Sequence, residues 1–238
     1  MKKVEVFKNG QDMGVIPAIY GDNWWFNPEF KDSFEIYELD SFYPKSELAK
    51  NVTDAVDMNN YIGSVLSHGE EILGKEVKSI VEFGSCAGGF TRKLMELGID
   101  VACVEGTSGG YELALENNIP ADRVHIKDLR RRINLNKKFD VALCTEVAEH
   151  IETPFSSMLV ETLTSHSDVI FFSSEGPGGN PNHYHHCNEQ PDKFWINLFD
   201  FYGFEYIHAE PEEISLLRGR NLFLYKNKNL KKAPNDPK

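Results

Sequence analysis

Long hydrophobic runs are missing from this chain of 238 residues, and no apolar stretch approaches the roughly 20 residues that span a bilayer. The first residues, MKKVEVFKNGQDMG, are interrupted by charged and polar side chains too early for a signal peptide. Paired cysteines are also missing, because Cys86, Cys103, Cys144 and Cys187 are scattered without a CxxC motif. This spacing excludes a disulfide framework and a thiolate zinc site, so we expect a soluble, cytoplasmic protein.

Positive charge is scarce. The chain has 25 Lys and Arg against 37 Asp and Glu, which gives a net charge of −12. Proteins that bind nucleic acid neutralise phosphates with Lys and Arg, so this balance argues against a nucleic-acid partner. Two basic stretches, 123–138 and 226–238, read more simply as a solvated face and a terminal tail.

From residue 77 onward, short apolar runs alternate with amphipathic segments. This rhythm predicts an α/β fold, a doubly wound and mostly parallel seven-stranded sheet. The last two strands, FEYIHAE and NLFLYKN, are joined by a segment too polar for a crossover helix, so we expect an antiparallel strand at the sheet edge. The predicted organisation is an aromatic-rich N-terminal segment with a helix (1–75), a Rossmann-like domain (76–226) and a basic tail (227–238).

The stretch VEFGSCAGGF, residues 81–90, follows the first predicted strand of this domain. In such a sheet a glycine turn at this place binds a nucleotide-like ligand. A dinucleotide site would need glycine at the middle position of G-x-G-x-x-G, where this chain has Cys86. A donor without a pyrophosphate, such as S-adenosylmethionine, relaxes that demand. Glu105 ends the second strand, where its carboxylate can accept hydrogen bonds from two ribose hydroxyls.

Four stretches in order, VEFGSCAGGFTRKL, VACVEG, IKD and FDVALCTEVAEHI, resemble the successive motifs of class I S-adenosylmethionine-dependent methyltransferases. The resemblance covers roughly residues 77–225. It implies a methyltransferase that uses S-adenosylmethionine and releases S-adenosylhomocysteine. Cys86 departs from the family's commonest acid-x-Gly-x-Gly-x-Gly pattern.

Carried over by position, the resemblance implies that the turn at 82–89 holds the methionine part of the donor and Glu105 its ribose. Asp128 would lie near the adenine amine, although it could equally cap the turn that follows it. The backbone at 144–146 would flank the sulfonium. The implied donor-binding residues are Glu82, Gly84, Ser85, Cys86, Gly88, Glu105, Gly106, Asp128, Leu129 and Thr145. Glu146 is assigned to the catalytic site, and Glu149 reads as an acid at a helix start.

The acceptor should bind after the fifth strand, where SSEGPGGNPNHYHHCNEQPDKFW has the composition of a loop. Part of it resembles an H-x-N-E-Q-P-x-x-[YF]-W stretch of some methyltransferases that act on sugars or other small metabolites, matched by His186, Asn188, Glu189, Gln190 and Trp195. Methyl transfer to a hydroxyl needs alignment and removal of a proton. His186 is the candidate general base, and His183 is the second candidate.

A metal-assisted alternative would use His183, His185 and His186 with Glu175 or Glu146; such a spacing is weak, and no metal is assigned. The function expected is methyl transfer to a small polar acceptor, such as a sugar hydroxyl. Three alternatives stay open: a methyltransferase acting on nitrogen, protein or RNA, a non-catalytic module that binds the cofactor, and an NAD-dependent oxidoreductase that Cys86 disfavours. The aromatic residues of 24–43 could form a lid over the acceptor or simply pack.

Overall fold

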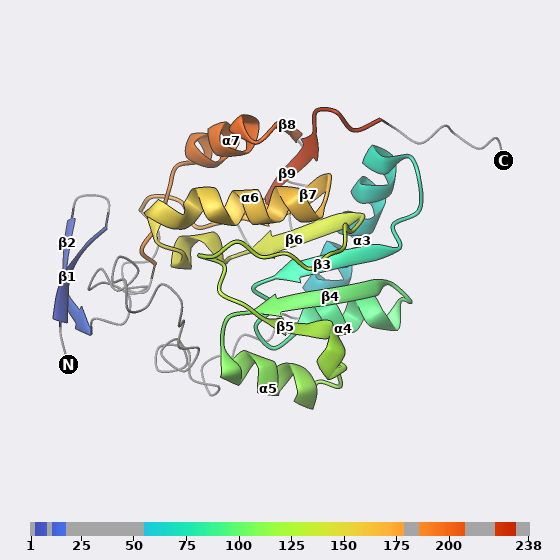
Figure 1. Ribbon diagram of the computed structural model, residues 1–238, viewed down its shortest axis with the longest axis horizontal. Coiled ribbons are helices and arrows are strands. Elements are labelled where there is room, and N and C mark those ends of the chain that lie inside the picture. The colour runs from blue at the N-terminus through green and yellow to red at the C-terminus, as the bar shows by residue number, and fades with distance from the viewer. Residues whose placement is uncertain (1–2, 9–10, 18–54, 179–185, 208–221, 232–238) are drawn as a thin grey trace.

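The computed structural model describes residues 3–8, 11–17, 55–178, 186–207 and 222–231 (Figure 1). His183, His185 and the aromatic stretch 24–43 lie outside these residues, so the expectations placed on them are untested. Among the described residues, no helix is both long enough and apolar enough to cross a membrane.

One seven-stranded sheet organises the fold. Its strands are β3 (Ser79–Phe83), β4 (Asp100–Glu105), β5 (Val124–Ile126), β6 (Val141–Thr145), β7 (Val169–Ser173), β8 (Phe204–Ile207) and β9 (Leu222–Asn227). They lie in the order β5-β4-β3-β6-β7-β9-β8. The five strands from β5 to β7 pair in parallel, which confirms the predicted doubly wound sheet.

The antiparallel pairing lies at the edge of the sheet, as expected. Strand β9 pairs antiparallel with β7 on one side and with β8 on the other, so β8 forms the edge. The predicted antiparallel pairing of the last two strands is confirmed. Strand β9 can take the inner position because it carries the more apolar sequence, with Phe223, Leu224 and Tyr225 all buried.

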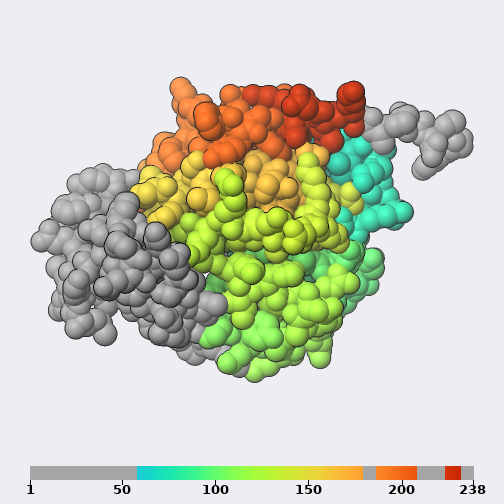
Figure 2. Space-filling view, in the orientation of Figure 1, coloured from blue at the N-terminus to red at the C-terminus, as the bar shows by residue number. Residues whose placement is uncertain are grey.

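Helices cover both faces of the sheet: α3 (Ala55–Leu73), α4 (Gly89–Glu96), α5 (Ser108–Glu116), α6 (Ser156–His166) and α7 (Asp192–Phe201). Alternation along each strand sorts the core between the two faces. In β3, Ile80 packs with residues of α3 and α4, whereas Val81 and Phe83 pack with residues of α6 and α7. Figure 1 shows α6 and α7 near each other on one side of the sheet. The segment between β5 and β6 is yellow-green in Figure 2. Its residues Leu129 and Ile133 belong to the same core as those of α6 and α7.

The helix expected in the N-terminal segment is α3, and it packs on the sheet. Its residues Tyr61, Ile62 and Val65 are buried, and they share a core with strands β3, β6 and β7. Upstream, β1 (Lys3–Lys8) and β2 (Gln11–Pro17) form an antiparallel hairpin that the sequence analysis did not anticipate. The intervening dipeptide is Asn-Gly, the commonest sequence of tight hairpin turns, so the signal was present.

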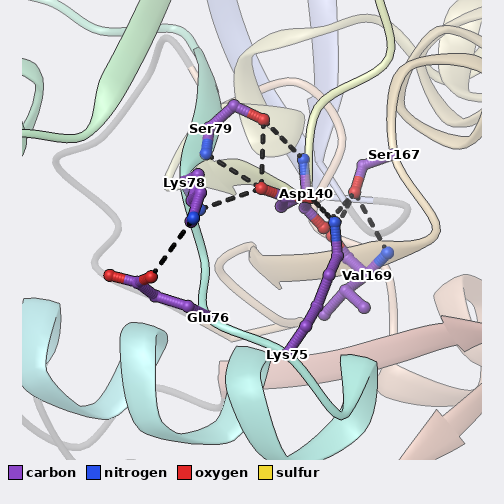
Figure 3. A network of polar contacts seen from close by, with 7 residues as sticks. All are labelled: Lys75, Glu76, Lys78, Ser79, Asp140, Ser167 and Val169. Carbon is purple, nitrogen blue, oxygen red and sulfur yellow. Dashed lines mark hydrogen bonds and ion pairs between the residues drawn. The ribbon is translucent and has the colours of Figure 1, made fainter. Parts of the chain in front are cut away.

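Asp140 ties the amino ends of the central strands together (Figure 3). Its Oδ2 accepts hydrogen bonds from the backbone amides of Lys78, at 2.9 Å, and Ser79, at 3.0 Å. Lys75 lies 2.5 Å from its Oδ1, and the Ser167 hydroxyl donates to its carbonyl oxygen. Burial opposes ionisation, but the contacts with Lys75 and the two amides prevail and lower the pKa of Asp140. This network fixes the amino ends of the strands, at the end of the sheet opposite the predicted site.

Candidate functional site

The predicted site residues lie at the carboxyl ends of the parallel strands. After β3 the chain builds β4 and β5 on one side, and it then returns to build β6 and β7 on the other. The direction of winding therefore reverses between β3 and β6, and ligands of such sheets bind in the crevice at this reversal. The turns after β3 and β4 form one half of the site, and the turns after β6 and β7 form the other.

The turn from β3 to α4 winds through three residues with left-handed backbone: Gly84 (φ 76°), Cys86 (φ 52°) and Gly88 (φ 73°). Cys86 thus keeps the conformation that glycine adopts freely, at a cost of about 1–2 kcal/mol for a residue with a Cβ. Gly84 is required for a second reason, because a Cβ there would lie 2.3 Å from Cγ2 of Val147. The turn after β3 therefore touches the turn after β6.

Glu82 is buried beneath this turn rather than presented to solvent, with 5% of its surface exposed. Its Oε2 accepts hydrogen bonds from the backbone amide of Thr91, at 3.1 Å, and from the Thr91 hydroxyl. Burial raises the pKa of Glu82 to about 7, against the lowering effect of the Thr91 donors. The carboxyl group fixes the first turn of α4 and so sets the shape of the loop above it.

Glu105 joins two loops at the end of β4. One carboxylate oxygen accepts a hydrogen bond from the amide of Cys86 at 2.8 Å. The other accepts from the amide and the hydroxyl of Thr107, at 2.9 and 2.7 Å. Gly110 of α5 leaves room for it, since a Cβ at that position would lie 2.7 Å from the Glu105 carboxyl carbon. Burial raises the pKa of Glu105, against these hydrogen bonds. The two Thr107 donors occupy both lone pairs of one oxygen, so the oxygen that accepts from Cys86 is the one with a lone pair for a ligand hydroxyl.

Asp128 is engaged by its own neighbours. Its carboxylate accepts from the backbone amide of Arg130 at 2.9 Å and from the guanidinium of Arg130 at 2.8 and 3.2 Å. Arg130 also lies 3.5 Å from Glu152. The turn-capping alternative is therefore present in the structure, while adenine contact stays a prediction. Leu129, which follows Asp128, is buried in the core, and Gly106 and Thr145 are half-buried at the strand ends.

Glu146 follows β6 in a left-handed conformation, with φ of 58°. Its amide donates to the carbonyl oxygen of Ser173 at the end of β7, and the Ser173 hydroxyl donates to its carboxylate at 2.8 Å. Non-glycine residues in this conformation are concentrated at functional sites, where neighbouring contacts stabilise them. Glu146 therefore links the turn after β6 to the end of β7.

His186 is buried in this second half, with 4% of its surface exposed. Its Nδ1 lies 2.8 Å from Oε2 of Glu175, which follows β7, and 3.4 Å from Oε1 of Glu189. The structure thus brings the candidate base together with two carboxylates. A carboxylate on one ring nitrogen orients an imidazole and leaves the other nitrogen for chemistry.

Glu149 and His150 complete this cluster, and the sequence analysis assigned neither of them to the site. They lie in a short 3-10 turn, η3 (Ala148–His150), after β6. The rings of His150 and His186 meet edge to face, with centroids 4.6 Å apart. Burial raises the pKa of Glu149 to about 7; nearby amides of Glu149 and Glu175 and the Ser174 hydroxyl act in the opposite direction.

Backbone pairing and Asn188 hold the cluster together. The carbonyl oxygen of Glu149 accepts hydrogen bonds from the amides of Cys187 and Asn188, at 2.9 and 3.0 Å. The Asn188 side chain donates to Ala148 and Ser156 and accepts from Thr153. Asn188 therefore has a positioning role in the stretch from His186 to Trp195, and Trp195 itself packs in the core against Phe172.

Comparison with known proteins gives two informative results, and no protein-family model matches the sequence. Among solved structures, the sugar N-methyltransferase KedS8 from a Streptoalloteichus species has a TM-score of 0.58 at 15% identity, over 82% of this chain and 94% of that one. The amino pentose methyltransferase CalS10 from Micromonospora echinaspora, solved with bound S-adenosylmethionine, has a TM-score of 0.56 at 14% identity, over 82% of this chain and 97% of that one. The chain therefore shares the fold of these methyltransferases. The fold expected from the four sequence stretches is thereby confirmed.

A curated relative extends this likeness to the sequence. The ubiquinone biosynthesis O-methyltransferase of Rickettsia bellii is 28% identical over 109 residues, which is 44% of this chain. The aligned part spans 43% of that methyltransferase, less than half its length. The activity of this chain is therefore argued below from its own site.

Proposed function

We propose that the chain transfers a methyl group from S-adenosylmethionine to a small polar acceptor, a hydroxyl of a sugar or a related metabolite. The observation that carries the proposal is the contact between Glu105 and the amide of Cys86. Through this contact the carboxylate that would receive the ribose also fixes the turn that would receive the methionine part. The donor half is therefore built before any ligand arrives.

The donor half suits a ligand without a pyrophosphate. Cys86 occupies the position at which a dinucleotide site needs a bare backbone. The Glu105 carboxylate, held by the amides of Cys86 and Thr107, adds negative charge beside the turn, which would repel phosphates and attract a sulfonium. Both features favour S-adenosylmethionine over NAD.

The acceptor half suits a hydroxyl. In the reaction a bond forms between the acceptor oxygen and the methyl carbon, the bond from that carbon to sulfur breaks, and the hydroxyl proton must leave. His186 lies among carboxylates at the carboxyl edge, where it can act on that proton. It can do so in two ways, by taking the proton itself or by holding a cation that acidifies the hydroxyl. The net charge of −12 disfavours RNA as acceptor.

Donor binding tests the proposal directly. Calorimetry with S-adenosylhomocysteine should show one site in the wild-type chain. Glu105→Gln keeps the shape of the side chain and removes its charge, and hydrogen bonds to a charged group contribute about 1.5–3 kcal/mol. We therefore expect roughly 10- to 100-fold weaker binding. Glu116→Gln, an exposed position at the end of α5, is the matched control and should bind as the wild type does.

Transfer is then measured as release of S-adenosylhomocysteine in the presence of sugars, amino sugars and phenols. Turnover with a hydroxyl acceptor supports the full proposal, and turnover only with amines would move the reaction to nitrogen. Absence of heat with the donor and its product, together with tight binding of NAD, would refute the proposal. Unchanged affinity in Glu105→Gln would refute the ribose assignment.

A further inference from the structure

Five ionisable side chains meet at the carboxyl edge beyond β6 and β7. The structure brings together two groups that share His186: Glu149 with His150 and His186, and Glu175 with Glu189 and His186. In each group the possible ligand atoms all lie within 4.8 Å of one another. Two of the five belong to the turn η3 and three to the residues that follow β7, so the tertiary fold creates the cluster.

The cluster brings three carboxyl groups and two imidazoles together. Imidazole and carboxylate groups are common ligands of divalent transition metals. Glu149 and Glu189 have side chains that are almost completely removed from water. Buried charge is tolerated when it is paired or coordinates a metal. A cation would satisfy this requirement.

Glu149 gives the strongest independent indication. It has no exposed surface, and no donor of the described residues meets either carboxylate oxygen in hydrogen-bond geometry, although the amides of Glu149 and Glu175 and the Ser174 hydroxyl lie nearby. A buried polar group without a partner is rare and points to an ion or water that belongs there. An ion bound to Glu149 could also be contacted by His150 and His186, which lie beside it.

We propose that Glu149, His150 and His186 bind a divalent transition-metal cation. Two imidazoles and one carboxylate suit Mn²⁺, Fe²⁺ or Zn²⁺, whereas Mg²⁺ and Ca²⁺ prefer a set made of oxygens. Ligand atoms about 2.0–2.2 Å from such an ion lie about 3–4 Å from one another. Small side-chain rotations would close the present spacing to that range. Three ligands leave coordination positions open for other oxygens.

Glu175 would then orient His186 from the opposite side. Its Oε2 lies 2.8 Å from Nδ1 of His186, outside hydrogen-bond alignment but close enough to reach it by a small rotation, and we therefore assign Nε2 to the metal. Carboxylates that hold a ligating histidine in this way fix its orientation and increase its basicity. Glu175 and Glu189 are therefore positioning residues, and Glu149 is the carboxylate ligand.

The role of this cation rests on the proposed function, although its binding does not. An acceptor hydroxyl on an open coordination position would lose its proton more readily, and its oxygen would be held for attack on the methyl carbon. His186 would then serve as a ligand, because a nitrogen bound to a metal cannot also take a proton. This differs from the base role expected from the sequence.

Metal binding is measured on the full, untagged chain after treatment with a chelator. Mn²⁺ is added, and free Mn²⁺ is followed by electron paramagnetic resonance. We expect one Mn²⁺ per chain, bound in preference to Mg²⁺. Glu175→Gln should weaken binding about 10- to 100-fold, as expected for an orienting carboxylate, and Glu149→Gln should weaken it further. Glu161→Gln on α6, which contacts Arg132 at the surface, is the control and should leave binding unchanged.

Each outcome decides the assignment. Absence of saturable Mn²⁺ or Zn²⁺ binding by the wild type would overturn the site, as would wild-type affinity in Glu149→Gln. Should Glu149→Gln fail to fold, His150→Gln at a half-buried position replaces it, with the same loss expected. Restoration of transfer by Mn²⁺ after chelation supports the role in the reaction. Bound metal without any effect on transfer refutes that role and leaves donor binding, and hence the proposed donor site, unaffected.

Discussion

Replacement of Glu82 by glutamine should remove part of the pH dependence of the free energy of unfolding. The Glu82 carboxyl is buried beneath the turn after β3, and burial raises its pKa from 4.5 to about 7. Between these two values the folded chain holds a proton that the unfolded chain has released. Stability from this group is therefore fully present below pH 4.5 and is lost as pH rises through about 7.

The size of the effect follows from the window. A full proton difference changes the free energy of unfolding by about 1.4 kcal/mol per pH unit. Because the difference is partial at both ends of the window, the wild type should lose about 2 kcal/mol from Glu82 between pH 5 and pH 8. Glutamine resembles the protonated acid and can still accept a hydrogen bond from Thr91, so Glu82→Gln avoids this loss.

Urea unfolding of both proteins at pH 5, 6, 7 and 8 measures the difference. Other raised carboxyls, such as Glu152, contribute equally to both proteins and cancel. Glu96→Gln removes an exposed acid paired with Arg92 and should follow the wild type at every pH. Parallel curves for Glu82→Gln and wild type would refute the claim that Glu82 holds a proton in the folded chain.

Three further substitutions test the site. Gly84→Ala should destabilise the fold by at least about 2 kcal/mol in thermal or urea unfolding, because of the positive φ of Gly84 and its contact with Val147. The control is Gly63→Ala in α3, which has open space around it and should stabilise the fold by up to about 1 kcal/mol. Equal changes in stability for the two variants would contradict the clash with Val147. Asn188→Ala should lower the free energy of unfolding by about 2–4 kcal/mol, since it leaves buried partners unsatisfied; a loss under 1 kcal/mol would remove its positioning role. His186→Gln should slow transfer at least about 100-fold while calorimetry shows unchanged donor affinity, and full turnover would exclude any part for it in the reaction.

Much of the fold follows from local patterns in the sequence. The alternation of apolar strands with amphipathic helices predicts the parallel sheet, and the polar link before β9 predicts its antiparallel pairing with β8. The sequence does not predict which of these two strands is outermost, because local sequence does not state which neighbour a strand selects. The hairpin β1–β2 was missed although its Asn-Gly dipeptide is a known turn signal.

The candidate site divides in the same way. The residues predicted to bind the donor lie within sequence motifs, so Glu82, Cys86 and Glu105 could be proposed from the sequence alone; their role stays a prediction. The cluster after β6 and β7 depends on a contact between His150 and His186, which are 36 positions apart in the chain, and on hydrogen bonds from the 187–188 amides to Glu149. No periodicity encodes such a meeting, and so Glu149 read only as an acid at a helix start.

The Asp140 network has a practical consequence for engineering. It clamps the strand starts through main-chain amides, whose geometry does not depend on side-chain identity. Strand alignment is therefore secured at the end of the sheet opposite the candidate site. Replacing the loops at the other end should consequently leave the strand pairing intact, which makes the chain a suitable scaffold for loop exchange.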